Sequence, residues 1–168
     1  MSQTDELLKN NEAYAEKFDK GGLPLPPARK VAVVACMDAR LNPSYLLGLE
    51  EGDAHVIRNA GGVITDDEIR SLAISQRLLG TEEIILIHHT DCGMLTFQDD
   101  DFRRQIQDDV GIKPQWAPES FADLEADLRQ SVARLQASPF LPHLDRVRAF
   151  AYEVETGRMR EVGAGKQD

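Results

Sequence analysis

Short apolar runs alternate along the chain with segments in which apolar residues recur at helical spacing. Three runs are short and rich in β-branched or aliphatic residues, as is typical of buried strands: 31–36, 54–58 and 83–88. Between the second and third runs, Thr65-Asp-Asp-Glu68 has the form of a capping box, and an apolar helical face continues to Leu79 before Gly80. Asn42-Pro43 predicts the start of a shorter helix through Leu49. Strands alternating with helices predict an α/β fold with a mainly parallel sheet.

The segments outside this alternating part have a different character. We predict further helices at 4–18, 98–110 and 120–137, a loop at 111–118, and a terminal hairpin or edge strand over 146–155 and 158–162. The first helix carries so little apolar surface that it needs something to lie against, which indicates a partner subunit. We expect a single domain over residues 1–168, with 1–27 as an N-terminal helix and connector arm.

Charge and composition narrow the possible partners and the location. The chain has 168 residues, with 29 acidic against 19 basic side chains and a formal net charge of −10. This balance argues against a nucleic-acid partner and against a membrane surface bound through basic residues. The longest aliphatic run, 84–87, is far too short to cross a bilayer. Because no secretory signal is evident at the N-terminus, we expect a cytoplasmic protein whose two cysteines are free thiols.

The two cysteines both follow predicted parallel strands. Cys36 ends the first run, and His89-Thr-Asp-Cys92 follows the third. The carboxyl ends of parallel strands are where open α/β sheets bind ligands. Two thiolates and one imidazole match the preference of Zn²⁺, and placement at two strand ends favours a metal site over buried thiols or a disulfide.

The number of ligands indicates what kind of zinc site this is. Structural zinc normally has four protein ligands, whereas catalytic zinc keeps a position open. With no third cysteine, the set points to catalysis, and Asp38 is the nearest candidate for an optional fourth ligand. Spacing from Cys92 favours His89 over His88, which we expect to pack or form a hydrogen bond on the other face of the strand.

Two polar stretches lie near these ligands. An Asp-x-Arg pair in a loop is commonly a solvated ion pair, but Asp38 and Arg40 stand beside a metal thiolate. Arg40 could hold Asp38 away from zinc, free to accept a proton, or release it to close the site. Asn59-Ala60-Gly61-Gly62 follows the second strand on the same edge, and could be a tight turn or could present backbone N–H groups to an anionic substrate.

Together these motifs resemble those of a known enzyme family. The stretches that carry the likeness are Cys36-Met-Asp38-Ala-Arg40, Arg58-Asn-Ala-Gly61 and His89-Thr-Asp-Cys92, within similar sequence over most of residues 5–125. They resemble the β-class carbonic anhydrases, in particular the short actinobacterial-type members. The likeness implies four parallel strands, the fourth beginning near Val147, with a fifth added antiparallel at the edge.

The resemblance also implies an activity and a site. It implies a zinc lyase (carbonate dehydratase) that reversibly hydrates CO₂ to bicarbonate and a proton by attack of zinc-bound hydroxide. Zinc would be held by Cys36, His89 and Cys92, with Asp38 either bonded to Arg40 in an open state or coordinating the metal in a closed one. A homodimer or dimer of dimers is implied, with the N-terminal helix embracing the partner.

Two alternatives remain open from the sequence. Hydrolases of carbonyl sulfide or carbon disulfide occur on the same scaffold, and residues 59–64 are also similar to the corresponding stretch of carbonyl sulfide hydrolases. A non-enzymatic structural zinc module or thiol sensor is the other alternative. The missing fourth thiol or imidazole weighs against structural zinc, and the absence of a Cys-x-x-Cys pair weighs against a thioredoxin-like role.

Overall fold

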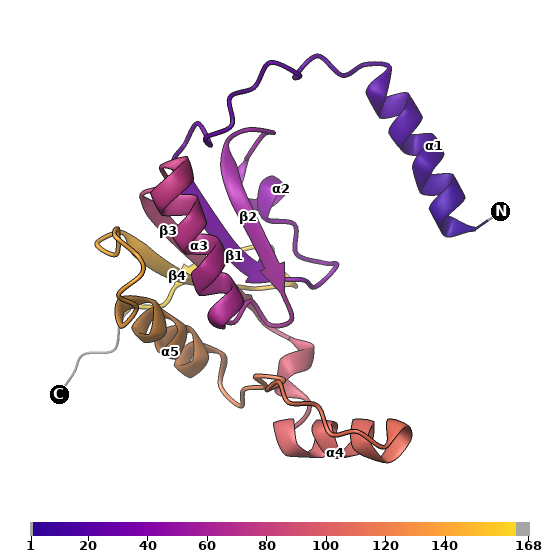
Figure 1. The fold of residues 1–168 in the computed structure, drawn as a ribbon, viewed down its shortest axis with the longest axis vertical. Coiled ribbons are helices and arrows are strands. Elements are labelled where there is room, and N and C mark those ends of the chain that lie inside the picture. The colour runs from indigo at the N-terminus through magenta and orange to yellow at the C-terminus, as the bar shows by residue number, and fades with distance from the viewer. Residues whose placement is uncertain (1, 164–168) are drawn as a thin grey trace.

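A computed structural model describes residues 2–163 and contains a five-stranded sheet at its centre (Figure 1). The strands are β1 (Val31–Cys36), β2 (Ala54–Asn59), β3 (Glu83–His89), β4 (Val147–Tyr152) and β5 (Met159–Glu161), in the order β2-β1-β3-β4-β5. The first four run parallel, and β5 pairs antiparallel with β4. The expected mainly parallel sheet with an antiparallel edge strand is therefore confirmed, as is a fourth parallel strand beginning at Val147.

The helices are α1 (Gln3–Ala15), α2 (Pro43–Leu47), α3 (Asp66–Leu79), the 3₁₀ turn η1 (Gly93–Leu95), α4 (Asp99–Val110) and α5 (Leu124–Gln136). Helices α3 and α5 pack against the sheet, and the other helices lie in its connections and in the N-terminal arm. Their ends follow from local chemistry. The Asn42 side chain accepts the Ser44 N–H at the start of α2, and the Glu68 carboxylate accepts the backbone N–H of Thr65 at 2.9 Å before α3.

Two helix boundaries differ from the sequence-based expectation by three residues or more. The helix predicted from residue 120 begins at Leu124, because Asp123 is its N-cap and accepts the Ala126 N–H at 2.7 Å. The first helix ends at Ala15 rather than residue 18. Both differences concern helix ends and leave the arrangement of strands and helices unchanged.

Alternating residues of the central strands face two separate cores. One contains Ala32 and Val34 of β1 with apolar residues of α3 and α5, including Leu72 and Leu128. The other contains Val33, Ala35 and Cys36 of β1, with Leu41, Val63, Ile87, Cys92, Met94 and Phe121. Period-two alternation thus sends one face of the sheet to the helices, and the other into the core where both cysteines lie.

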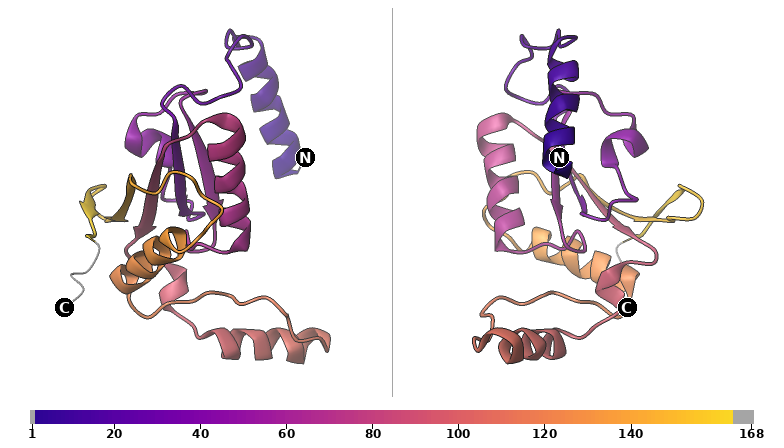
Figure 2. Two further views of the ribbon diagram at one scale, coloured as in Figure 1. Left: turned by 60° about the vertical axis from the view of Figure 1, so that its left-hand side comes forward. Right: turned by 90° about the vertical axis from the view of Figure 1, so that its right-hand side faces the viewer.

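Two parts of the chain stand away from the sheet (Figures 1 and 2). Helix α1 has no buried residue, and Leu7, Leu8 and Tyr14 on it are exposed. The Tyr14 hydroxyl donates to Glu51 at 3.2 Å, which ties the end of this arm to the body of the molecule. At the other end of the molecule, α4 projects with the segment that follows it. No helix within residues 2–163 is long and apolar enough to span a membrane.

Candidate metal centre

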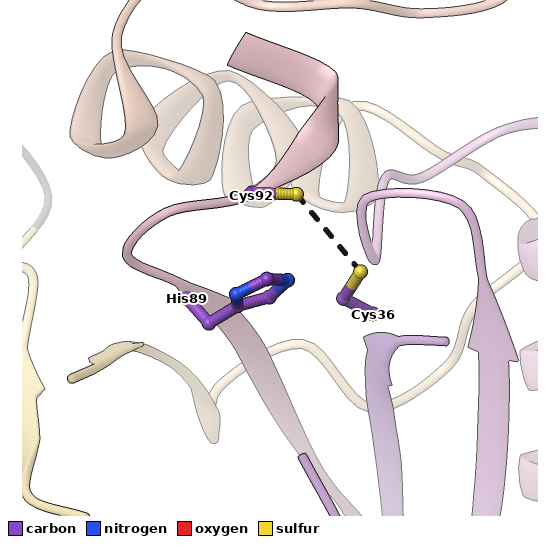
Figure 3. Close-up of side chains that lie close together, drawn as sticks. All are labelled: Cys36, His89 and Cys92. Atoms are coloured by element: carbon purple, nitrogen blue, oxygen red, sulfur yellow. Dashed lines mark hydrogen bonds between the residues drawn. The ribbon is translucent and has the colours of Figure 1, made fainter. Parts of the chain in front are cut away.

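Three side chains of the metal-binding type meet at the carboxyl ends of β1 and β3. Cys36 is the last residue of β1, His89 is the last residue of β3, and Cys92 directly precedes η1. One ligand atom from each lies within 4.8 Å of the others, and all three residues are buried (Figure 3). Because parallel neighbours end at the same edge, the sheet itself brings these residues together, as the strand-end argument predicts.

The geometry of this group fits a zinc ion. The two sulfur atoms lie 4.0 Å apart and both cysteines are free, far beyond the roughly 2.05 Å of a disulfide. Two sulfurs on a common tetrahedral zinc, each about 2.3 Å from the metal, would lie about 3.8 Å apart. The observed separation therefore needs little adjustment to accept the metal.

The His89 ring is oriented for coordination through one nitrogen. Its Nδ1 donates to the Thr90 carbonyl oxygen at 2.8 Å, since a carbonyl can only accept. This bond leaves Nε2 as the unprotonated nitrogen of the neutral ring, and Nε2 is buried without a hydrogen-bond partner. A buried acceptor with no partner is unfavourable, and a metal ion beside the two sulfurs would satisfy it.

The groups that surround the Cys36 sulfur favour its thiolate form. The Cys92 thiol makes the largest contribution, and the N–H groups of Asp38 and Gly61 add to it, so that the pKa of Cys36 is lowered. The same contact with Cys36 raises the pKa of Cys92, because one proton is shared between two adjacent sulfurs. A lowered pKa favours the thiolate, which is the form in which cysteine binds a metal.

Asp38 lies beside the three ligands and is held by Arg40. Its Oδ1 accepts the Arg40 backbone N–H at 2.8 Å and Nε–H at 3.0 Å, and Oδ2 accepts Nη2–H at 2.8 Å. These bonds hold the pKa of Asp38 well below its usual range, so the carboxylate is ionised at neutral pH. Asp38 Oδ2 lies 3.7 Å from His89 Nε2. The carboxylate therefore sits next to the ligand cluster without belonging to it.

A second acidic residue, Asp91, contacts the same guanidinium. Arg40 Nη1 donates to Asp91 Oδ2 at 2.7 Å, and Nη2 donates to the Asp91 carbonyl oxygen at 2.9 Å. The bonds to Asp38 and then to Asp91 raise the pKa of Arg40. Sequence reasoning assigned Asp91 no role, although its place directly before Cys92 was a usable signal.

Arg58 shapes the loop that carries Asp38, and its role was also missed. It reaches across from β2 and donates to the carbonyl oxygens of Cys36, Asp38 and Leu41 at 2.6–3.0 Å. Three carbonyls turned towards one guanidinium fix the course of the backbone after β1. The Arg58-Asn-Ala-Gly61 stretch was noted in the sequence, but strand periodicity could not show where a long side chain reaches.

The glycine-containing stretch 59–62 turns close to the end of β1. The Gly61 N–H faces the Cys36 sulfur. A Cβ on Gly62 would lie 2.8 Å from the Cys36 nitrogen, so this glycine allows the chain to pass close to β1. Asn59 donates to the Val63 carbonyl at 2.8 Å. Asn59 and Ala60, however, also line a cavity of about 610 Å³ with Trp116 and Arg134 among its other walls.

His88 points away from the cluster, as its place one residue before His89 predicts. The ring is fully buried, stacks on Phe121 with centroids 5.3 Å apart, and its Nε2 lies 2.7 Å from Asp127 Oδ2. The prediction that His88 packs and forms a hydrogen bond on the other face of the strand is confirmed. This contact ties β3 to α5.

Comparisons with known proteins agree with this geometry. A profile described as carbonic anhydrase matches residues 31–133. The chain is 60% identical over 162 residues to beta-carbonic anhydrase 1 of Mycobacterium tuberculosis, covering 96% of this chain and 99% of that one. A crystal structure of carbonic anhydrase from Streptococcus mutans superposes with a TM-score of 0.91 at 44% identity, over 97% of this chain and 99% of the other.

A related enzyme with another named substrate is also similar. Carbon disulfide hydrolase of Saccharolobus solfataricus is 35% identical over 182 residues, covering 94% of this chain and 87% of that protein. The likeness is weaker than that to the mycobacterial protein, and it extends over the same part of the chain.

Proposed function

The chain is a member of the β-class carbonic anhydrase family, and we propose that Asp38, held by Arg40, handles the proton in its reaction. The enzyme is a zinc lyase, a carbonate dehydratase that converts CO₂ and water reversibly to bicarbonate and a proton. The observation that carries the assignment is the meeting of Cys36, His89 and Cys92 around a space that a metal ion fits, with an ionised carboxylate at its side.

The residues of the site have three different roles in the proposed reaction: binding the metal, transferring the proton and orienting the carboxylate. The two sulfurs and His89 Nε2 would hold Zn²⁺, which when bound would lower the pKa of a coordinated water to near neutrality, as it does in carbonic anhydrase. Asp38 accepts a hydrogen bond from the reacting water and takes up its proton. Because its pKa is low, Asp38 passes this proton on rather than retaining it. Arg40 keeps the carboxylate oriented for this task.

Residues 59–62 support substrate binding in this proposal, with two kinds of contribution. Asn59 and Ala60 line the cavity, which also has apolar walls from Val63 and Ile69 that suit an uncharged linear molecule. Gly62 lets the backbone pass close to that of Cys36, and the Gly61 N–H favours the Cys36 thiolate.

The assembly we propose is a homodimer or a dimer of dimers. An α1 helix with no buried residue gains stability only by packing against something beyond its own body, and a second copy supplies a matching surface. A similar structure is titled as tetrameric beta-carbonic anhydrases from Sordaria macrospora. We also propose that residues 1–168 form one domain with residues 1–27 as its arm, and that the protein works in the cytoplasm.

A second candidate substrate is carbon disulfide or carbonyl sulfide. The 35% identity to a carbon disulfide hydrolase, over 94% of this chain, favours it specifically. The 60% identity to a beta-carbonic anhydrase favours CO₂ more strongly.

One assay decides between these substrates. Zinc-loaded protein is mixed with CO₂ in a stopped-flow instrument with a pH indicator, and the same sample is tested for sulfide release from carbonyl sulfide and carbon disulfide. We expect rapid CO₂ hydration that is lost in Cys36→Ser. Sulfide release faster than CO₂ hydration would support the alternative, and zinc binding without either activity would indicate a structural site.

A further inference from the structure

Arg40 connects the two loops that carry the cysteine ligands. On one side it makes a two-pronged contact with Asp38, two residues after Cys36. On the other side it bonds to both the carboxylate and the carbonyl oxygen of Asp91, directly before Cys92. Within residues 2–163, the hydrogen bonds of this guanidinium go to these two aspartates alone. Its position is therefore set jointly by both loops.

The backbone at Asp91 is shaped to present this carboxylate. Asp91 has φ = 53°, a left-handed conformation that Asp and Asn tolerate better than most residues. The turn allows one residue to offer two acceptors to the same guanidinium. An exposed ion pair usually contributes little, because two long side chains must be ordered. Here the Arg40 side chain is already ordered by Asp38, so the added contact with Asp91 restricts little further motion.

We propose that Asp91 is a positioning residue for the reaction. By holding Arg40 from the side opposite Asp38, its carboxylate keeps Asp38 on the guanidinium and out of the coordination position that the three ligands leave open. This inference rests on the proposed function, because it assumes that the open position is where the reaction takes place. Asp91 touches neither metal ligand atoms nor substrate and acts only through Arg40.

Removing the Asp91 carboxylate takes away one of the four hydrogen bonds of the Arg40 guanidinium, together with its ion pair, and leaves the bond to the Asp91 carbonyl oxygen. Arg40 then holds the Asp38 carboxylate less firmly. Asp38 Oδ2 already lies 3.7 Å from His89 Nε2, close to the metal position. More molecules should therefore have Asp38 as a fourth ligand. A simple electrostatic effect has the opposite sign, because loss of a nearby negative charge favours binding of an anion to the metal.

The test uses Co²⁺-substituted protein titrated with thiocyanate, followed by visible absorbance. Thiocyanate needs the open position, so closure by Asp38 weakens its apparent affinity. If closure occupies about two thirds of the molecules, the apparent Kd rises about threefold. We expect the full rise in Asp91→Gly, which removes the acceptor of the Arg40 Nη1–H, and a smaller rise in Asp91→Asn, whose amide oxygen still accepts that hydrogen bond without the charge; both residues are compatible with the left-handed backbone. Asp67→Asn, which removes an exposed partner of Arg70 on α3, is the matched control and should leave the Kd unchanged.

A double variant isolates the part played by Asp38. In an Asp38→Ala background no carboxylate can close the site, so adding Asp91→Asn should no longer weaken thiocyanate binding. Equal or tighter binding by Asp91→Asn in the otherwise native protein would overturn the proposal, as would the same weakening in the Asp38→Ala background. The two proposals fail separately: absence of CO₂ hydration by the native zinc protein contradicts the proposed function, whereas unchanged thiocyanate affinity contradicts the role of Asp91 alone.

Discussion

At the scale of single residues, Asp38 combines two properties that are seldom found together near a metal site. It is ionised and closely held, yet its Oδ2 lies 3.7 Å from a buried, unpartnered ring nitrogen. We predict that Asp38→Asn lowers kcat for CO₂ hydration by about 100-fold or more, because the amide cannot take up a proton. Zinc content, measured by atomic emission, should remain near one per chain. Full activity in this variant would refute the proposed role.

Gly62 makes a separate contribution, to the backbone beneath the site. Its φ is +71°, and an added Cβ would lie 2.8 Å from the Cys36 nitrogen and 3.0 Å from the Ile87 oxygen. Because these backbone atoms cannot move aside cheaply, we predict that Gly62→Ala lowers the free energy of unfolding by about 3 kcal/mol. Gly80→Ala is the matched control, since Gly80 has φ = +73° with open space around it.

Urea denaturation of the two variants separates close contact from backbone strain. Gly80→Ala should lose only about 1–2 kcal/mol, the strain of a left-handed residue with a side chain. Equal losses in both variants would mean that the close approach of residue 62 to β1 is unimportant for stability.

At the scale of elements, α1 is a helix with no buried residue within the described part of the chain, and its large apolar side chains are exposed. Leu7 is 64% exposed and Tyr14 is 51% exposed, and they lie seven residues apart along one side of the helix. We predict that Leu7→Asp converts a dimer to monomer, or lowers dimer affinity by at least tenfold, because a charge would enter an apolar contact. Glu12→Gln, on another side of the helix, should leave the assembly intact.

The mass of each variant follows from light scattering after size-exclusion chromatography over a range of concentrations. A Leu7→Asp protein with the same dimer affinity as the native chain would show that α1 does not contribute to the interface.

Elements also show which parts of the fold could be predicted from sequence. Periodicity predicts β1, β2 and β3, whereas the fourth parallel strand is implied only by the family resemblance. The shared edge of parallel strands brings Cys36 and Cys92 together. Periodicity could not show that a left-handed turn at Asp91 aims a carboxylate at Arg40, nor that Arg58 binds three carbonyls across the sheet. Those contacts depend on long side chains that leave their own element, and local sequence carries no record of their direction.

At the scale of the whole molecule, metal binding and folding should be coupled. The ligands come from residues far apart in the chain, so the unfolded protein offers no preformed site. Free zinc at about 100 times its Kd adds about 2.7 kcal/mol of stability, which corresponds to a rise in Tm of roughly 5–10 °C for a chain of this size. Scanning calorimetry with zinc and with a chelator measures this difference. In Cys36→Ser the rise should largely disappear, and an equal rise in that variant would place the metal elsewhere.

The most direct measurement is a crystal structure of the zinc-loaded protein with anomalous scattering recorded on both sides of the zinc edge. We predict one strong peak per chain, bonded to both sulfurs and to His89 Nε2, with one position left to solvent and the Asp38 carboxylate bonded to Arg40. A peak elsewhere, a fourth protein ligand that closes the site in every molecule, or a bond between the two sulfurs would contradict it.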